Sequence, residues 1–512
     1  MKTVIMSDNM HTIDDYRRLY DESVTNGTDF WRRMADTFDW HTIAGHSPRF
    51  GHNFDTSSAP IDVHFMSGSQ TNVCHNLIDR NIALGFGSRI AYHWVGHEFE
   101  LNMALTYSQL RDQVCRFANV LKGLGLKKGD TIINYTPDLI QTVISMLAAI
   151  RLGVVYANTF PGYSAQCLAQ RMLDLKCKVL ITSDVYYSYK RFNDLKQYSD
   201  QAINICRQNN HEIKARIFIK YLSDGNYSPN ISDYNSDLDP RLDHWWHDLI
   251  EKADTECPPV WVDSEDPLFV IFSSGSTGKQ KAIVHSSGGF MVMSALVFKH
   301  AFNYTDGDVV YCSGCLGWIT GQFSHVFGSL ANAATVVLSE GSQTYPTPGR
   351  WWRIIDEYKV NIFYVNPTDI RNLRSFGDQY PNDYPMADLK VIGVVGETID
   401  GETWKWLYEV IGRQRCPIVN TYFQSETGCP IIFPIPGVIP IKVGSVSLPF
   451  FGVQPVIIDE NGHELEGEGN GTLLIKTAFP SIARTLYGDY NLYEKTYFHK
   501  YPNYYFTGDG MY

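Results

Sequence analysis

The sequence contains no long hydrophobic run. Hydrophobic residues make up 44% of its 512 residues, yet the longest apolar stretches, such as 143–150, fall well short of the ~20 residues that a bilayer-spanning helix needs. The apolar stretch at the N-terminus is too short for a secretory signal, and acidic residues follow it too soon for a transit peptide. We therefore expect a cytoplasmic protein with no membrane partner.

Cysteine is sparse, with 10 residues spread along the chain. This spacing is unlike the dense framework of a disulfide-stabilised protein, so we expect reduced thiols. One pair, Cys312-Ser-Gly-Cys315, has the spacing of a zinc or redox motif. A structural zinc site needs a second ligand pair at comparable spacing, and none follows. We interpret the pair as packing residues.

An excess of positive charge is also lacking. The chain has 43 lysine and arginine residues against 55 aspartate and glutamate residues, a net charge of -12. This balance opposes nonspecific nucleic-acid binding, because the nucleic-acid backbone attracts basic surfaces. A local basic pocket for a phosphorylated cofactor remains compatible with it.

The sequence instead shows an alternation of helices and apolar strands, in a chain long enough for two to four units at ~150 residues per domain. Caps and periodicity predict helices at 106–121, 138–152 and 164–175, and buried strands at 130–135, 153–158 and 178–183. A second alternating region has strands at 335–338, 361–365 and 389–395. This order predicts parallel sheets with right-handed crossovers.

We divide the chain into three regions. We predict that residues 1–100 form an N-terminal extension around the main body and that residues 101–430 form an α/β core. Residues 431–512 contain short strands and glycine turns, which predict a small β-rich subdomain. Within the core, the polar and tyrosine-rich residues 186–265 predict an insertion with its own helices. The expected fold class is α/β, with two parallel α/β subdomains that meet at a cleft.

The most informative segment is Ser273-Ser-Gly-Ser-Thr-Gly-Lys-Gln-Lys281, a hydroxyl- and glycine-rich loop between two apolar runs. Such a loop can surround a phosphate group, because glycine lets backbone N–H groups approach closely. It is not a Walker A loop, since Gln280-Lys281 and β-branched residues follow Gly278-Lys279 in place of Ser or Thr and a helix. The segment predicts a strand–loop–strand phosphate site, and the alternative is an ordinary hairpin turn.

Three further loops lie at predicted strand ends, where open α/β sheets bind ligands. They are Gly317-Trp-Ile-Thr-Gly321, Val395-Gly-Glu-Thr398 and Thr421-Tyr-Phe-Gln-Ser-Glu-Thr-Gly428. Glu426 is a candidate Mg²⁺ ligand beside a triphosphate, since that ion is usually held by one or two carboxylates. Asp509 is a candidate ligand of ribose hydroxyls. The alternatives are capping or solvated side chains in the loops, and a simple Asp-Gly turn at Asp509.

Three of these segments, Ser273–Lys281, Thr421–Gly428 and Tyr505-Phe-Thr-Gly-Asp509, resemble in this order the core motifs of the adenylate-forming superfamily. Within it the chain is most similar to the AMP-forming acetyl-CoA synthetase branch of short-chain acyl-CoA synthetases, from about residue 30 to the end. Further segments that carry this likeness are Val114-Cys-Arg-Phe-Ala-Asn-Val-Leu, Gly317-Trp-Ile-Thr-Gly, Tyr345-Pro-Thr-Pro and Phe450-Phe-Gly-Val-Gln-Pro.

The resemblance implies a two-step reaction that uses ATP, Mg²⁺ and CoA with a small carboxylate. The carboxylate attacks the α-phosphate of ATP to give acyl-AMP and pyrophosphate, and the CoA thiol then displaces AMP. The implied catalytic residues are Thr277, Lys279 and Glu426, with Glu426 also the metal ligand. The implied ATP- and AMP-binding residues are Ser274, Gly275, Ser276, Gly278, Gly396, Glu397, Thr398, Asn420, Thr421, Tyr422, Gln424, Ser425 and Asp509.

The chain departs from these relatives in its implied acyl pocket, formed by Ile319, Thr320, Val395 and Phe423. Acetate enzymes usually have Trp at the place of Phe423 and Val at the place of Ile319. Because a methylene in an apolar pocket is worth only ~1–3 kcal/mol, the exchange is expected to shift preference from acetate towards propionate or a small branched acid.

Other departures concern the nucleotide and CoA contacts. Asn420 replaces a usual Asp, which puts adenine contacts in question, and Gln280 replaces a usual Pro, which changes loop stiffness. Arg191 stands where relatives bind a CoA phosphate, although a surface cation is an equal interpretation, and Ser188 stands where they have a second Arg.

Relatives continue beyond the Gly-Asp-Gly motif into a C-terminal domain with a lysine that contacts the reacting groups, whereas this chain ends at Tyr512. We expect that domain to be absent from these residues, and the 512-residue form to bind ATP or acyl-AMP but to adenylate poorly. Two other functions remain: adenylation for a carrier protein, and a nucleotide-binding module without catalysis.

Overall fold

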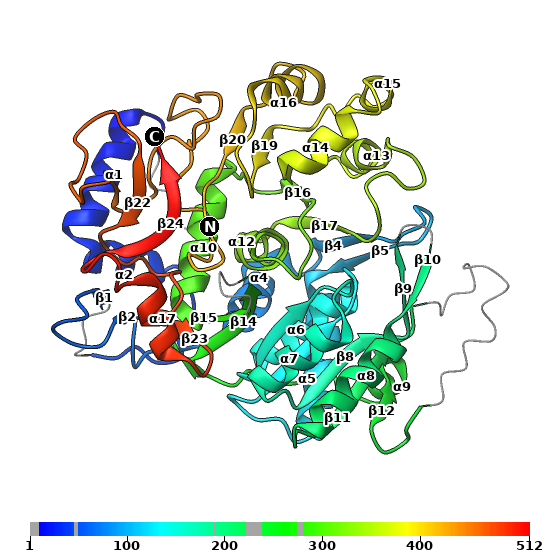
Figure 1. Cartoon of the computed structure of the whole chain (residues 1–512). Coiled ribbons are helices and arrows are strands. Elements are labelled where there is room, and N and C mark those ends of the chain that lie inside the picture. The colour runs from blue at the N-terminus through cyan, green and yellow to red at the C-terminus, as the bar shows by residue number, and fades with distance from the viewer. Residues whose placement is uncertain (1–9, 46–49, 189–190, 222–237, 275–279) are drawn as a thin grey trace.

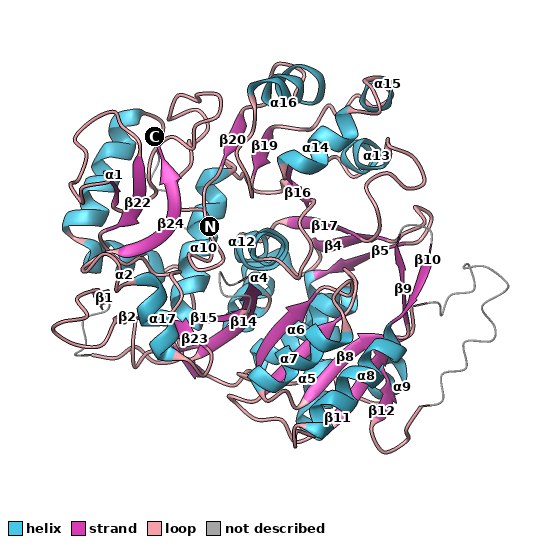
Figure 2. Ribbon diagram, in the orientation of Figure 1, coloured by secondary structure: helices cyan, strands magenta, loops and turns pink. Residues whose placement is uncertain are grey.

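Two central β-sheets organise the protein, as a computed structural model shows (Figures 1 and 2). The structure describes residues 10–45, 50–188, 191–221, 238–274 and 280–512. The strands of the eight-stranded sheet are, in spatial order, β12 (Asp243–Trp245), β11 (Ala215–Ile219), β8 (Val179–Ser183), β6 (Thr131–Tyr135), β7 (Val155–Thr159), β14 (Pro267–Ser273), β15 (Lys281–Ser286) and β23 (Thr485–Leu486). Neighbours are parallel as far as β14, whereas β15 and β23 are antiparallel to theirs.

A second sheet has seven strands. They are, in spatial order, β20 (Ile418–Asn420), β19 (Val391–Val394), β18 (Ile362–Val365), β16 (Val309–Cys312), β17 (Thr335–Ser339), β4 (Ile90–Val95) and β5 (Asn102–Thr106). All neighbours are parallel except β4 and β5. The predicted α/β class is therefore confirmed, with two mixed sheets whose strands are mostly parallel.

Helices cover both sheets, as expected for parallel strands that are buried on two faces. Those near the eight-stranded sheet are α5 (Tyr107–Gly123), α6 (Ile140–Arg151), α7 (Ala165–Leu175), α8 (Leu195–Gln208) and α9 (Trp246–Glu251). Those near the seven-stranded sheet are α13 (Arg350–Glu357), α14 (Pro367–Arg374), α15 (Gln379–Asn382), α16 (Gly401–Trp406) and η3 (Leu407–Ile411). Between the sheets lie α10 (Ser287–Ala301) and α12 (Gly328–Ala331) (Figure 1). The short α11 (Ile319–Gln322) is followed by η2 (Phe323–Phe327), which packs on α10, α12 and strands β16 and β17.

Local signals in the sequence account for several of these elements. Thr106 caps α5 with a reciprocal pair, in which its hydroxyl accepts from Gln109 N at 3.2 Å and the Gln109 side chain accepts from Thr106 N at 2.9 Å. Ser164 caps α7. Helix α10 is apolar along nearly its whole length, which explains why it is buried between other elements rather than amphipathic at the surface.

One prediction about the core is wrong. Residues 186–265 are not an insertion, because β11 and β12 extend the eight-stranded sheet and α8 packs on α7. Every residue of β11 is buried, so its short apolar run is a strand of the main sheet. The same region also contributes the hairpin of β9 (Val185–Ser188) and β10 (Arg191–Asp194).

The N-terminal elements pack on several parts of the molecule. They are α1 (Ile13–Thr25), α2 (Gly27–Ala35), β1 (Phe50–Asn53), β2 (Asp62–Phe65), β3 (Gln70–Thr71), which pairs with β13 (Val262–Asp263), α3 (Val73–Leu77), α4 (Asp79–Asn81) and η1 (Ile82–Phe86). Helix α1 packs on the C-terminal region, and α3 packs on α6, α10 and α12. The hydroxyls of Tyr16 and Tyr20 donate to the carbonyls of Pro449 and Val453 at 2.7 and 2.9 Å. The seven-stranded sheet includes β4, so the core sheet begins on the N-terminal side of residue 101.

The C-terminal region contains an antiparallel sheet of β21 (Pro455–Ile458), β22 (Gly471–Ile475) and β24 (Tyr505–Met511), together with α17 (Tyr490–Tyr497). Helix α17 contacts both β24 and β23, and thereby touches the edge of the eight-stranded sheet (Figure 1). None of the helices in the described parts of the chain has the length and apolar composition needed to cross a membrane.

Candidate functional site

Adjacent strands of the seven-stranded sheet bring two predicted ligand loops together. Val394 at the end of β19 pairs with Asn420 at the end of β20, so the residues after both strands leave the same carboxyl edge side by side. Thr421 donates to the Val394 carbonyl through its N–H at 2.9 Å and its hydroxyl at 2.8 Å. Asn420 and Thr421 are buried and fix this edge, whereas Gly396, Glu397 and Thr398 are exposed beside it.

Two residues of the 396–398 loop have a defined local role. Gly396 has a φ of 93°, which other residues rarely adopt. The space that a Cβ would occupy at this position is open, so a ligand can approach the backbone there. Glu397 accepts hydrogen bonds from the Thr368 hydroxyl and, at 2.8 Å, from Arg371 Nη2, both on α14. Partial burial raises the pKa of Glu397, but these two donors outweigh it and hold the pKa below its usual value.

The predicted ribose carboxylate is held by the 421–428 loop. Asp509 Oδ2 accepts hydrogen bonds from the Tyr422 hydroxyl and from Gln424 Nε2, each at 2.7 Å. Tyr505 in turn donates to Gln424 Oε1 at 2.9 Å. Burial and the Asp509 carboxylate raise the pKa of Tyr422, so its phenol remains a donor. Three residues that were predicted separately as nucleotide ligands therefore form one cluster.

The predicted metal carboxylate lies two residues further along the same loop. Glu426 is buried, and its Oε1 accepts from Lys281 Nζ at 2.9 Å and from the Tyr497 hydroxyl. Its backbone carbonyl accepts from Ala483 N at 2.7 Å, and the preceding Ser425 carbonyl lies 2.8 Å from His285 Nε2. Neither Lys281 nor Tyr497 was predicted as a site residue.

The phosphate loop joins β14 to β15, with Ser273 paired to Lys281 at the base of the hairpin. This confirms the strand–loop–strand architecture. Ser274 is exposed at the start of the loop, whereas the predicted residues Gly275, Ser276, Thr277, Gly278 and Lys279 lie outside the described residues. Gln280, which replaces a usual Pro, accepts at 2.8 Å from Arg171 Nε of α7 and so fixes the end of the loop to a helix.

The predicted acyl-pocket residues follow strands of the same sheet edge. Ile319 begins α11 after β16, Val395 follows β19, and Phe423 follows β20. Ile319 and Val395 are buried in one apolar cluster, and the half-buried Phe423 packs against it with its ring 6.4 Å from that of Phe323. Thr320 is half-buried. These residues have the apolar surroundings that an acyl pocket needs, and their role in such a pocket stays a prediction.

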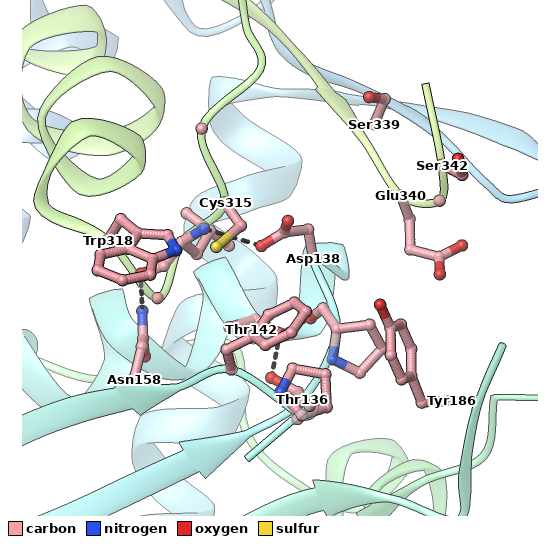
Figure 3. A pocket seen from close by; sticks show the side chains of 18 of the residues that line it. Thr136, Asp138, Thr142, Asn158, Tyr186, Cys315, Trp318, Ser339, Glu340 and Ser342 are labelled. Atoms are coloured by element: carbon pink, nitrogen blue, oxygen red, sulfur yellow. Dashed lines mark hydrogen bonds between the residues drawn. The ribbon is translucent and has the colours of Figure 1, made fainter. Parts of the chain in front are cut away.

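A cavity of about 930 Å³ opens beside the Gly317-Trp318 segment, between the carboxyl ends of the two sheets (Figure 3). Asn158 Nδ2 donates to the Leu316 carbonyl at 2.9 Å, and Leu316 N donates to Asp138 Oδ1 at 2.8 Å. Figure 3 shows Asp138, Glu340 and Tyr186 directed towards the same space. The sequence reasoning did not find this cavity, because its residues come from the ends of strands in both sheets.

The carboxyls of the cavity are unusual. Burial raises the pKa of Asp138 to about 7, and burial raises that of Glu340 to about 7 although Tyr221 donates to it at 2.8 Å. No Lys, Arg or His belongs to the described residues that line the cavity. The cavity therefore suits an uncharged polar group better than a phosphate. Arg191 lies in β10, and its side chain is outside the described part of the structure.

Comparisons with known proteins agree with this geometry. The family described as "AMP-binding enzyme" matches residues 80–487, and the family described as "Acetyl-coenzyme A synthetase N-terminus" matches residues 16–77. The chain is 42% identical over 503 residues to "Acetyl-coenzyme A synthetase" of Drosophila melanogaster, covering 98% of this chain and 75% of that protein. It is 41% identical over 495 residues to "Acetyl-coenzyme A synthetase, chloroplastic/glyoxysomal" of Arabidopsis thaliana, covering 97% and 66%.

A solved structure, "Acetoacetyl-CoA Synthetase from Streptomyces lividans", is similar with a TM-score of 0.84 and 22% identity, covering 97% of this chain and 73% of that one. At that identity the likeness shows a shared fold only. The sequence identities above, over nearly the whole chain, show more. Together with the three motifs gathered around residues 421–428, they establish that the chain belongs to the AMP-forming acetyl-coenzyme A synthetase family.

Proposed function

We propose that this protein activates a short-chain carboxylate with ATP and transfers the acyl group to CoA, as an AMP-forming acid–thiol ligase. One observation carries the proposal: the 421–428 loop contacts both other motifs at once. Its Glu426 is paired with Lys281 of the glycine-rich hairpin, and its Gln424 binds Asp509 of β24. Three sequence motifs therefore meet where the phosphates, metal and ribose of one nucleotide would lie.

In the first step, an oxygen of the substrate carboxylate attacks the α-phosphorus of ATP, and the bond to pyrophosphate breaks. The ammonium of Lys281 and the N–H groups of the hairpin supply electrostatic stabilisation as charge develops on the phosphates. Glu426 fits a hard cation, because it is a buried carboxylate at the phosphate end of the site. Bound there, Mg²⁺ would neutralise charge on the leaving phosphates. Thr277 and Lys279 stay predictions as phosphate contacts.

In the nucleoside part of the site, Asp509 presents acceptor oxygens to the ribose hydroxyls, and Tyr422 and Gln424 fix its orientation. Gly396 and its neighbours form the exposed rim against which adenine would lie. Asn420 and Thr421 hold that rim through the sheet edge. Ser274 and Ser425 complete the proposed nucleotide contacts.

In the second step, the CoA sulfur attacks the carbonyl carbon of acyl-AMP, the bond to AMP breaks, and the thiol proton is released. We assign the cavity beside Trp318 to the pantetheine arm of CoA, since that arm is uncharged and rich in amides. Asn134, Asn158 and the two carboxyls Asp138 and Glu340 offer it donors and acceptors. Arg191 stays a prediction for a CoA phosphate.

The acid itself is decided by the pocket around Ile319, Thr320, Val395 and Phe423. The relatives are named for acetate, and Phe423 in place of Trp enlarges the pocket while Ile319 in place of Val reduces it. Together the two replacements change the size of the pocket by one or two methylenes, each worth ~1–3 kcal/mol. We therefore propose that acetate and propionate are both substrates. The cytoplasmic location stays a prediction.

ATP–pyrophosphate exchange tests the proposal. Acetate, propionate, butyrate and isobutyrate are compared at equal concentration, first without CoA and then with it, with Glu426→Gln as the inactive control. Exchange with at least one acid, followed by release of acyl-CoA, is expected. Exchange without acyl-CoA release would favour a carrier-protein enzyme, and ATP binding without exchange would favour a nucleotide-binding module.

A further inference from the structure

Tyr497 shares a single carboxylate oxygen with a lysine from another element. Its hydroxyl donates to Glu426 Oε1 and accepts from Lys281 Nζ at 2.6 Å. Lys281 Nζ also donates to the same Oε1 at 2.9 Å. The three side chains form a closed cycle: two of the three N–H groups of the ammonium donate within it, and the phenol both accepts and donates.

The cycle is shielded from water. Tyr497 is 4% exposed and Glu426 is 7% exposed, so solvent competes little for their hydrogen bonds. A phenol has one O–H, which here donates to the Glu426 carboxylate, while the phenol oxygen accepts from Lys281. Hydrogen bonds to an ionic partner are stronger and more directional than neutral ones.

Both contacts of the Glu426 side chain end on Oε1. Within the described residues, the second oxygen, Oε2, has no hydrogen-bond partner. The backbone of Glu426 is fixed as well, by the bond from Ala483 N to its carbonyl. The carboxylate is thus clamped at one oxygen, while the other is left for a ligand.

Tyr497 also lies between the two ends of the proposed nucleotide site. Its ring stacks on Tyr505 with centroids 5.5 Å apart and an interplanar angle of 23°. Tyr505 donates to Gln424, which binds Asp509. The phenol is therefore packed against the support of the ribose carboxylate while its hydroxyl holds the metal carboxylate.

We propose that Tyr497 is a positioning residue for the metal: its hydroxyl orients Glu426 through Oε1 and leaves Oε2 directed to the Mg²⁺ of MgATP. This inference rests on the proposed function, since it assumes that Glu426 binds the metal. The competing interpretation is that Tyr497 is only a core aromatic, packed on Tyr505 and α17.

Tyr497→Phe separates these interpretations, because it keeps the ring and its stacking and removes only the hydroxyl. The matched control is Tyr493→Phe on the same helix. Tyr493 is equally buried, and its hydroxyl donates at 2.6 Å to the Ala483 carbonyl rather than to the metal carboxylate. Both variants lose one buried phenol hydroxyl, so their thermal unfolding midpoints show how much of any effect is structural.

The experiment measures ATP binding to the 512-residue protein by calorimetry, over a series of Mg²⁺ concentrations and in excess EDTA. Removal of a side chain that orients a metal ligand typically costs on the order of tenfold or more in metal affinity. We therefore expect Tyr497→Phe to need about tenfold more Mg²⁺ for half-maximal enhancement of ATP binding. Metal-free ATP binding should change less than about twofold, and Tyr493→Phe should keep the wild-type Mg²⁺ dependence.

Two results would overturn the inference: the same Mg²⁺ dependence in Tyr497→Phe as in wild type, or an equal shift in Tyr493→Phe. If wild-type protein bound no ATP at any Mg²⁺ concentration, the proposed function would fail first and the inference with it. If wild type bound MgATP normally and Tyr497→Phe showed no shift in Mg²⁺ dependence, the proposed function would stand and Tyr497 would be a packing residue.

Discussion

Buried carboxyl groups occur in two neighbouring regions of the site, and they are held in opposite ways. At the metal corner, Lys281 and Tyr497 converge on one oxygen of Glu426. In the cavity, the Asp138 carboxyl accepts a hydrogen bond from the backbone N–H of Leu316, and the Glu340 carboxyl accepts one from the phenol of Tyr221. The described lining contains no basic side chain. Burial raises the pKa of both cavity carboxyls to about 7.

The difference shows that a basic partner bonded directly to the carboxylate, rather than burial alone, decides what a buried carboxyl can bind. The charge of Arg350 lowers the pKa of Glu340, but burial outweighs it. A carboxylate with a lysine beside it keeps its charge balanced and can share that charge with a metal and phosphates. A carboxyl without such a partner tends to take up a proton and then acts as a donor to a neutral ligand. The first region fits phosphoryl chemistry, and the second fits the amide-rich arm of CoA.

The largest effect is expected from breaking the ion pair. Lys281→Met leaves the Glu426 carboxylate buried without its cation, which typically costs about 3–5 kcal/mol. It also removes a charge that stabilises the developing phosphate charge, so ATP–pyrophosphate exchange should fall by about 100-fold or more. Lys495→Met, an exposed lysine on α17, is the control. Exchange that stays within about threefold of wild type would mean that Lys281 has no part in the chemistry.

The next effect is a pH dependence of stability from the cavity carboxyls. Their folded pKa values, about 7, lie above the ordinary values of 3.8 for Asp138 and 4.5 for Glu340. Their contribution is therefore fully present below pH 4 and is lost as the pH rises towards 7, because only the unfolded state ionises in that range. At ~1.4 kcal/mol per pKa unit the loss amounts to a few kcal/mol for each carboxyl.

Urea unfolding at several values between pH 4 and pH 8 measures this effect. The double variant Asp138→Asn with Glu340→Gln should show a smaller fall in unfolding free energy over that range than wild type. Asp14→Asn, at an exposed carboxylate of α1, should leave the fall unchanged. Identical pH profiles for wild type and the double variant would show that both cavity carboxyls are ordinary, and the contrast between the two regions would disappear.

A third change tests the ribose end, where the Asp509 carboxylate accepts from two neutral donors and pairs with no lysine of the described residues. Asp509→Asn weakens two hydrogen bonds to a charged acceptor, each worth ~1.5–3 kcal/mol. AMP binding, measured by calorimetry without metal, should weaken by about tenfold to 100-fold. Asp459→Asn, in a turn of the same β-rich region, is the control. Because AMP binding needs no metal, this variant should not alter the Mg²⁺ dependence of ATP binding. A shift in that dependence would mean that the ribose end and the metal end of the site are not separable.

The smallest effect is expected where no charge is involved. Phe423→Trp fills the acyl pocket with the larger ring that acetate enzymes usually carry. The ratio of kcat/KM for acetate over propionate should rise by about tenfold, in line with ~1–3 kcal/mol per methylene. Phe376→Trp, at an exposed site, should not change the ratio. An unchanged ratio in Phe423→Trp would place the acyl specificity elsewhere.

Much of the fold could be predicted because its signals are local. The helices predicted to start at residues 106 and 164 do start there, capped by Thr106 and Ser164, and the apolar runs at 131–135 and 179–183 are buried strands. The error at 186–265 arose because β11 is flanked by polar residues and lies far in sequence from its partner β8. Strand pairing between distant segments carries no local signal.

The candidate site divides in the same way. Glu426, Gln424 and Asp509 lie within motifs whose residue types already point to a nucleotide, and the structure brings them together. Tyr497 lies 71 residues from Glu426, in a helix whose sequence resembles any amphipathic segment, so nothing near it marks a role. Asp138 and Glu340 each follow a buried strand and look like ordinary polar ends until the two sheets are placed against each other.

By itself, the sequence determined the strand–loop–strand phosphate motif, the alternation of the α/β core and the family likeness, because each depends on residues close together in the chain. Only the tertiary structure decided that Lys281 and Tyr497 bind one oxygen of Glu426, and that Asp138 and Glu340 face one cavity whose described lining has no basic side chain. The physical reason is that burial and charge pairing depend on which distant segments exclude water together, and side-chain chemistry responds to that environment rather than to sequence neighbours.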